Sequence, residues 1–494
     1  MAGTKSLLKD SAIYGGSAIL VRSVSWLMTT LLTYFLLQSE FGMMNYLYAY
    51  TALFLVILTF GMETGFFRFA NQNDAYEVDT VYSTTLLLVG GLVALFLAVF
   101  LIFLPLIRPL VWDQDAPLSY IRLILIIVSL DAFSAIPFAY LRYRKRPVKF
   151  GALKILYIVL YAVFCIFFLV VCPQISRHAP STIDWFWRED FRLGYVFVSN
   201  LLATSIQTVF LVSELTGFRY RFDVALAKKM LRYCFPLMLM GLAGMSNQVV
   251  DKIVFPAVYP DHDAWSGELG IYNACFKIAM IMMMYTQAFR YAYEPFVFEK
   301  NKEKNSRQSY ADVMKYFVIL GLLVFLGVMF YLDIIKYFID PKYFGALDIV
   351  PIVLMGELCF AVYFNLSIWY KLSDKTYWGT VFSVVGFVLI VVFNIVFIPK
   401  YSYHACAWAS FIGNGIIMLL SYFIGQKYYP IRYDLKTIGL YMGLALGLYA
   451  VFYFVPIHHT GLRLGFNTFL IGIFILVMLK RDFPLKKMLS HKTG

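Results

Sequence analysis

Long runs of mostly apolar residues recur along the whole chain, and they constrain its fold more than any other feature. A helix that crosses a bilayer needs about 20 such residues, and within the lipid it satisfies its own backbone hydrogen bonds. The first run, SAIYGGSAILVRSVSWLMTTLLTYFLL at residues 11–37, is long enough by itself. The sequence therefore predicts an all-α polytopic membrane protein with about fourteen transmembrane helices. The predicted spans lie near residues 12–37, 42–67, 81–107, 118–140, 150–172, 191–216, 233–258, 269–296, 311–335, 346–370, 376–398, 403–425, 435–456 and 462–480.

The composition agrees with a membrane protein and not with a soluble one. Of 494 residues, 61% are hydrophobic and only 14% are charged. A soluble domain is about 45–50% apolar and about 25% charged. The chain therefore has more apolar residues than a water-soluble core of this size requires.

Lys and Arg are concentrated in alternate loops, which predicts the orientation of the chain, because cytoplasmic loops hold the excess of these residues. The basic set is LRYRKRPVKF, FRYRFDVALAKKMLR, EKNKEKNSRQ, QKYYPIRYDLK and the tail KRDFPLKK. The opposite set is LLQSEFG, VWDQDAPLS, VYPDHDAWSGE and VPIHHTG. Both termini are thus predicted in the cytoplasm. The net charge of +13 is mostly a topology signal, and it favours contact with anionic membrane lipids over binding to nucleic acid.

Motifs for soluble enzyme chemistry are absent from the sequence. It contains no G-x-S-x-G, no H-E-x-x-H and no Walker A loop, and its six cysteines and six histidines form no ligand pattern. The longest predicted external loop, about 173–190, is too short to be a domain. We therefore expect no catalytic residues and no metal site, and we expect any binding chemistry to lie among the helices.

Two similar segments suggest an internal repeat. FGMMNYLYAYTA begins the second predicted span, LGIYNACFKIAM begins the eighth, and each leads to an aromatic-Arg-aromatic segment, FFRFA or FRYAY. An offset of six spans predicts two six-helix lobes, as repeats in transporters often do. The predicted lobes are residues 1–220 and 221–427, followed by an additional helix pair and cytoplasmic tail at 428–494.

Three cations inside predicted spans are the first candidate binding residues: Arg22, Lys277 and Arg290. A charge inside a bilayer costs about 2.5–3.5 kcal/mol on insertion scales, so it usually faces a cavity or a partner. Arg offers a fixed fork of donors and Lys a point charge, so a cavity containing them would attract phosphate or pyrophosphate.

Four carboxylates are candidates for a coupling ion or for ion pairs: Asp131, Asp251, Glu294 and Glu357. Such a group can carry a proton or help to bind Na⁺, so the only cofactor expected is a coupling ion. The same groups also have structural alternatives, since Asp251 adjoins Lys252 and Glu294 follows Arg290 by one helical turn. Three other charges near span ends are expected to snorkel toward an interface: Lys154, Glu214 and Lys252.

Several stretches resemble the polysaccharide branch, the O-antigen flippase-like proteins, of the multidrug/oligosaccharidyl-lipid/polysaccharide exporter superfamily. They are EFGMMNYLYAYTALFLVILTFGMETGFFRFAN, IPFAYLRYRKRPVKFGALK, LGIYNACFKIAMIMMMYTQAFRYAYEPFVFEK and NLSIWYKLSDKTYWGTVFSVVGFVLIVVFNIVFIPKYSY. The segment from Asn394 to Pro399 looks like the family's junction between the eleventh and twelfth spans. Ser402 stands where the family usually has Gly.

The resemblance implies a fold of two six-helix lobes in a V around a central cationic cavity. It implies a flippase of the bacterial inner membrane that moves undecaprenyl-pyrophosphate-linked oligosaccharide from the cytoplasmic to the periplasmic leaflet by alternating access, for lipopolysaccharide or other surface polysaccharide. Arg22 matches a first-span Arg that lies in the cavity of related lipid flippases. The last two helices would hold the polyprenyl tail, and polysaccharide polymerase machinery is a candidate partner.

Three other functions remain open. A MATE-type drug/cation antiporter would need acidic cavity residues, which Asp131, Asp251 and Glu357 could supply. A membrane-embedded glycan polymerase or ligase would normally carry a large periplasmic loop, which this chain lacks. A scaffold without transport would gain nothing from charges buried in the membrane.

Overall fold

The computed structural model describes residues 2–71, 76–300, 306–373, 375–457 and 459–482, and every regular element in these ranges is helical. The predicted all-α fold is thus confirmed. Twelve helices in the described ranges are long and apolar enough to cross a membrane. The predicted first and seventh spans correspond to helices α1 and α10, which are 34 and 35 residues long but are not among the twelve. In α10 the polar stretch 246–248 lowers the mean hydropathy.

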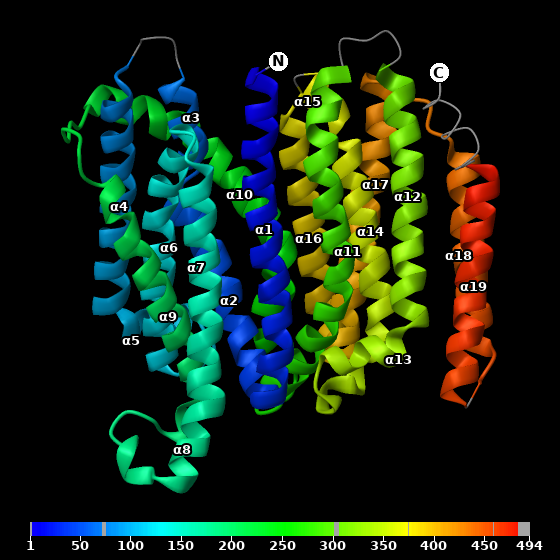
Figure 1. The fold of residues 1–494 in the computed structure, drawn as a ribbon, viewed down its shortest axis with the longest axis horizontal. Coiled ribbons are helices and arrows are strands. Elements are labelled where there is room, and N and C mark those ends of the chain that lie inside the picture. The colour runs from blue at the N-terminus through cyan, green and yellow to red at the C-terminus, as the bar shows by residue number, and fades with distance from the viewer. Residues whose placement is uncertain (1, 72–75, 301–305, 374, 458, 483–494) are drawn as a thin grey trace. The chain divides into compact units, whose positions relative to one another are not determined.

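The chain divides into two compact units. Unit 1 contains residues 1–273 and 394–402, and unit 2 contains residues 274–393 and 403–494. The lobe boundaries at 220 and 427 stay a prediction. The helices of unit 1 are α1 (Ala2–Phe35), α2 (Gln38–Thr59), α3 (Met62–Ala70), α4 (Val78–Ile102), α5 (Leu104–Val111), α6 (Leu118–Tyr143), α7 (Pro147–Ile166), α8 (Cys172–His178), α9 (Arg192–Leu211) and α10 (Val224–Val258) (Figure 1).

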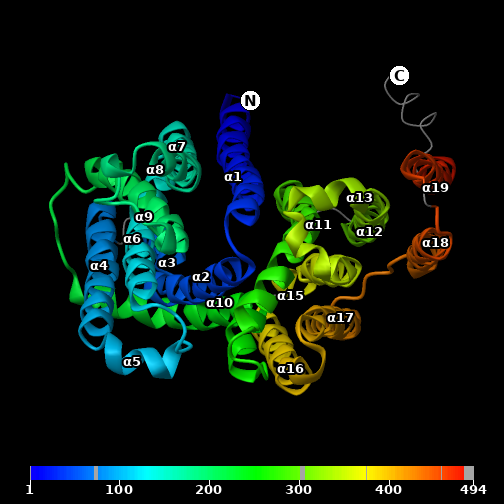
Figure 2. The same cartoon turned by 90° about the horizontal axis from the view of Figure 1, so that it is seen from below.

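Helix α6 is the central helix of unit 1. It packs against α2, α3, α4, α7 and α9, and Figure 2 shows it surrounded by these neighbours when seen from below. Its Tyr140 ring stacks on Tyr82 of α4 with centroids 4.0 Å apart. Because α6 has protein on most sides, a polar residue in its middle faces other helices and not lipid.

A sharp break divides the predicted second span into α2 and α3. Phe60 and Gly61 have φ angles of 51° and 68°, so two successive residues adopt the left-handed conformation. Such a conformation ends a helix, and Gly adopts it without a steric penalty. The break redirects α3 and its charged residues.

The two segments of the predicted repeat meet in space at their glycines. A Cβ atom on Gly42 would collide with the backbone carbonyl of Ser266 and lie 2.8 Å from the backbone nitrogen of Gly270. A Cβ atom on Gly270 would collide in turn with the carbonyl of Gln38. The asparagines of the repeat also make the same bond, since Asn45 and Asn273 each donate to the carbonyl four residues earlier at 2.7 Å.

Unit 2 is built around α12 and α14. Helix α12 packs against α14, α18 and α19, while α14 packs against α17. Two helices, α11 and α16, contribute residues to both units. The helices are α11 (Trp265–Lys300), α12 (Ser306–Phe330), α13 (Leu332–Ile335), α14 (Val350–Leu366), α15 (Ile368–Leu372), α16 (Tyr377–Tyr401), α17 (Tyr403–Tyr428), α18 (Leu435–Phe454) and α19 (Thr460–Arg481).

Polar contacts hold α19, the second of the two additional helices, to α12 and α13 near both ends of α19. Near one end, Asn467 donates to the carbonyl of Phe330 at 2.6 Å, and Arg463 forms an ion pair with Asp333. Near the other end, Lys315 of α12 lies 3.3 Å from the carboxylate of Asp482. These polar contacts determine where the pair docks, because apolar contact alone would not distinguish α12 from lipid.

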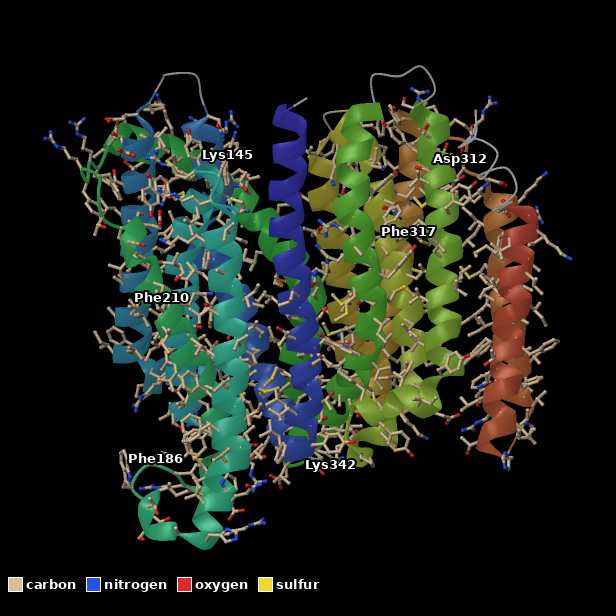
Figure 3. All side chains as sticks on the ribbon, viewed as in Figure 1. Lys145, Phe186, Phe210, Asp312, Phe317 and Lys342 are labelled. Carbon is tan, nitrogen blue, oxygen red and sulfur yellow. The ribbon has the colours of Figure 1, made fainter. Side chains whose placement is uncertain are left out.

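The turn between α6 and α7 and the loop after α8 lie at opposite ends of unit 1. Lys145, in the turn between α6 and α7, lies at one end, and Phe186, in the loop after α8, lies at the other (Figure 3). In unit 2, Asp312 and Lys342 likewise lie at opposite ends (Figure 3). Within each unit, these two positions lie at opposite ends, as expected for helices that span a membrane.

Candidate functional site

A cavity of about 530 Å³ lies inside unit 1 and is lined by residues of α2, α3, α6, α7 and α9. Its size is typical of sites that bind small molecules. The lining includes four charged side chains, Glu63, Asp131, Arg142 and Lys154. It also includes hydroxyl, amide and aromatic groups, so the cavity can make both polar and apolar contacts.

One face of α6 supplies most of the cavity wall. Asp131, Ser134, Ala135, Phe138 and Arg142 all line the cavity. Each lies three or four residues from another member of the set, so they share one side of the helix. Asp131 lies near the middle of the 26-residue helix, where α6 is surrounded by other helices.

The opposite wall comes from α7, where Phe150, Lys154 and Tyr157 have the same helical spacing. The ammonium of Lys154 lies 3.9 Å from the centre of the Phe138 ring, a cation–π contact. Within the described ranges, neither Lys154 nor Asp131 makes a hydrogen bond or an ion pair. An acidic and a basic group thus face one cavity, close enough to attract each other electrostatically but without a direct hydrogen bond or close ion pair.

The other two charges are paired. Arg142 forms an ion pair with Glu63, which belongs to α3, and both side chains are partly exposed. The Arg142 guanidinium also lies over the Phe67 ring, 5.1 Å from its centre. The break at residues 60–61 places Glu63 here, since it redirects α3 toward the end of α6.

Hydrogen bonds behind the cavity hold its walls in place. Gln207 of α9 donates to the carbonyl of Leu153 at 2.9 Å. The Tyr157 hydroxyl donates to the side-chain oxygen of Asn200 at 3.0 Å, and the Asn200 amide donates to Tyr48 of α2 at 2.9 Å. Asn200 and Gln207, two polar residues of α9, therefore connect this helix with α7 and α2.

The predicted site residues are distributed over both units. Asp131 lines the cavity, and Arg22 is exposed on α1 outside the cavity lining. Asp251 is buried in unit 1, where it pairs with Lys252 at 3.0 Å and accepts a hydrogen bond from Tyr272 at 2.8 Å.

In unit 2, Arg290 stacks over the Phe364 ring at 3.7 Å, and Lys277 and Glu357 are half-buried in α11 and α14. Glu294 lies in α11, but its side chain is outside the described residues. The roles proposed for all seven residues from the sequence stay predictions.

Sequence reasoning missed Glu63 and Arg142 and expected Lys154 to snorkel. The helical spacing of Asp131, Ser134, Phe138 and Arg142 was a usable signal, because four such residues on one face of a buried helix indicate a lined cavity. No metal site emerges elsewhere: the described residues contain no group of three or more His, Cys, Asp and Glu that could hold a metal ion.

Comparisons with known proteins identify the family of this chain. Residues 7–293, more than half of the chain, match the family described as polysaccharide biosynthesis protein, and residues 266–396 match the MatE family. No curated protein matches the sequence.

Two solved structures share the fold. Lipid II flippase MurJ in an inward closed conformation aligns with a TM-score of 0.74 and 14% identity over 94% of this chain and 98% of that one. A multidrug resistance MATE family transporter of the MOP superfamily, in an inward-facing conformation, aligns with a TM-score of 0.63 and 14% identity over 84% and 94%.

Proposed function

This chain belongs to the polysaccharide biosynthesis protein family, within the multidrug/oligosaccharidyl-lipid/polysaccharide exporter superfamily, and from that premise we propose that it is a lipid-linked glycan flippase. It moves undecaprenyl-pyrophosphate-linked oligosaccharide from the cytoplasmic to the periplasmic leaflet of the bacterial inner membrane by alternating access. The observation that carries this proposal is a family match over more than half of the chain, combined with the fold of a lipid II flippase over nearly all of it.

The proposal assigns Arg22, Lys277 and Arg290 to the pyrophosphate of the substrate. Each is a cation within a predicted span, and bidentate or point-charge donors of this kind suit phosphate oxygens. The substrate would compensate part of the cost of placing these charges in the membrane. Proton or Na⁺ coupling would then fall to carboxylates such as Asp131.

A drug/cation antiporter is the second candidate. The observation in its favour is the match of residues 266–396 to the MatE family, together with two carboxylates in the unit 1 cavity. Against it, Arg142 and Lys154 balance these carboxylates. A cavity for cationic drugs should instead have an excess of negative charge.

Mass spectrometry of lipid extracts after depletion of this protein in its host tests the proposal. We expect a polyprenyl-pyrophosphate glycan to accumulate, and its mass would identify the cargo. An unchanged lipid pool would contradict the flippase. If new sensitivity to cationic drugs accompanied it, the antiporter would be supported instead.

A further inference from the structure

Asp131 and Lys154 present an unused acceptor and an unused donor to the same cavity. Both line it, from α6 and α7 respectively, and within the described ranges no hydrogen bond or ion pair engages either charged group. Ionisable groups within a membrane-spanning helix are costly and are usually paired or functional. The space between these two groups therefore calls for water or for a ligand with polar groups of both kinds.

The charge balance of the cavity disfavours a strongly charged ligand. Glu63 and Asp131 together cancel Arg142 and Lys154, and Glu63 already pairs with Arg142. A pyrophosphate would gain from Lys154 but would be repelled by Asp131, and a cation would meet the opposite conflict. The best complement is an uncharged molecule whose groups both donate and accept hydrogen bonds.

We propose that this cavity binds one uncharged sugar residue of the transported glycan. The inference rests on the proposed function and adds to it a recognition site for the sugar, separate from the cations assigned to the pyrophosphate. Each sugar hydroxyl is both a donor and an acceptor. Neighbouring hydroxyls can therefore donate to the Asp131 carboxylate and accept from the Lys154 ammonium, and hydrogen bonds to charged groups are the stronger kind.

The remaining walls suit the apolar face of a sugar ring. Phe150 and Tyr157 belong to the same face of α7 as Lys154 and offer aromatic surface beside the two charges. The Tyr157–Asn200–Tyr48 hydrogen bonds fix the α7 wall before any ligand arrives. A preorganised site loses less conformational freedom on binding. The volume of about 530 Å³ lies within the usual range for small-ligand sites.

Saturation-transfer NMR on the purified full-length chain in lipid nanodiscs tests the site directly. The probes are glucose, galactose and N-acetylglucosamine, with glucuronate and inorganic pyrophosphate as charged comparisons. We expect at least one neutral sugar to bind, and to bind at least tenfold more tightly than either charged probe. Failure of all three neutral sugars, or tighter binding of a charged probe, would overturn the proposal.

Two variants then locate the binding. Asp131→Asn keeps the shape but removes the charged acceptor, and Ala135→Phe fills the cavity without changing its charge. We expect each to weaken sugar binding at least tenfold. Asp79→Asn is the matched control, because Asp79 pairs with Arg144 outside the cavity lining. Unchanged binding in Ala135→Phe would refute the site even if Asp131→Asn failed to fold.

The two proposals can fail separately. If depletion causes a lipid-linked glycan to accumulate but no neutral sugar binds, the flippase stands and the sugar site is wrong. If sugars bind in the cavity but no glycan accumulates, the recognition site stands and the transported substrate must be sought among other sugar-containing compounds.

Discussion

Among single residues, the charges within the membrane-spanning helices differ in whether they have an ion-pair or hydrogen-bond partner. Asp251 has Lys252 and Tyr272 as partners, and Arg142 has Glu63. Arg22, in contrast, is exposed on α1 and makes no hydrogen bond or ion pair with the residues that the structure describes. A charge with no structural use is the better candidate for a functional one.

Replacing Arg22 by Ala should abolish glycan transport without affecting membrane insertion. The expected cause is loss of a guanidinium that neutralises phosphate oxygens, so Arg22→Lys should retain part of the activity as a point charge. The readout is accumulation of the lipid-linked glycan in cells that carry only the variant, with membrane-fraction abundance as the control. Normal transport in Arg22→Ala would remove this residue from the site.

Ser402 has a backbone conformation that favours glycine. Its φ is 49°, and its hydroxyl donates to the carboxylate of Glu268 at 2.9 Å. Glycine would adopt this left-handed conformation without a steric penalty. In this chain a side-chain hydrogen bond offsets part of the strain.

Ser402→Ala should therefore be less stable than wild type, by about 0.5–1.5 kcal/mol, because it keeps the strain and loses the hydrogen bond. Ser402→Gly should be more stable than Ser402→Ala, since glycine removes the strain. Thermal unfolding of wild type and of the two purified variants in the same detergent ranks their stabilities. An equal effect of the two substitutions would show that the backbone conformation contributes nothing.

Among helices, the crossing of α2 with the first turns of α11 depends on two glycines. The backbones approach so closely at Gly42 and Gly270 that neither position has space for a Cβ atom. Close approach through small residues is a common way to pack helices in membranes. Lipid tails are as apolar as the side chains, so the hydrophobic effect contributes little to helix association there. The repeat in the sequence is therefore also a contact in space.

Gly42→Ala and Gly270→Ala should each destabilise the protein markedly, by about 1–3 kcal/mol, as overpacked sites do. Gly267→Ala is the control from the same helix, because a Cβ atom there would have nothing within 4 Å. That substitution should be neutral or slightly stabilising, since Ala is the better helix former. Melting temperatures that fail to separate Gly267→Ala from the other two would contradict the close crossing.

Helix α18 begins with a titratable cap. The Asp434 carboxylate accepts a hydrogen bond from the backbone N–H of Thr437 at 3.1 Å, and the hydrogen bonds with Thr437 lower the pKa of Asp434. A lowered folded-state pKa means that the stabilisation is complete above the ordinary pKa of about 3.9 and is lost as the pH falls through the folded value.

Asp434→Ala should destabilise the start of α18 by about 0.5–2 kcal/mol at neutral pH. The difference from wild type should shrink as the pH falls below about 4, because the unfolded chain then binds the proton before the folded carboxylate does, and it should vanish once the folded carboxylate is also protonated. Asp434→Asn keeps a capping oxygen that does not titrate, so its stability should not show this pH dependence. Hydrogen exchange of the first α18 amides measures the stability of this helix start in wild type and in both variants. A difference between wild type and Asp434→Ala that does not change with pH would exclude the carboxylate as the cap.

For the whole molecule, the asymmetry of the basic loops predicts that both termini lie in the cytoplasm. Lys145→Cys and Asp184→Cys report on opposite ends of unit 1, since these positions belong to the turn after α6 and to the loop with Phe186 (Figure 3). A membrane-impermeant thiol reagent should label Asp184→Cys in intact spheroplasts and Lys145→Cys only after permeabilisation. The reverse pattern would invert the topology.

The helical class and the approximate number of spans follow from the sequence alone, because they depend on the length and order of apolar runs, and the family follows from the order of particular stretches. The sequence also identified Asp131 as a costly charge. Which charges share a cavity depends on how the helices pack in the tertiary structure. Glu63 meets Arg142 across 79 residues because the chain breaks at Phe60 and Gly61. Helical periodicity shows which residues share a face, but it does not show which helices that face meets.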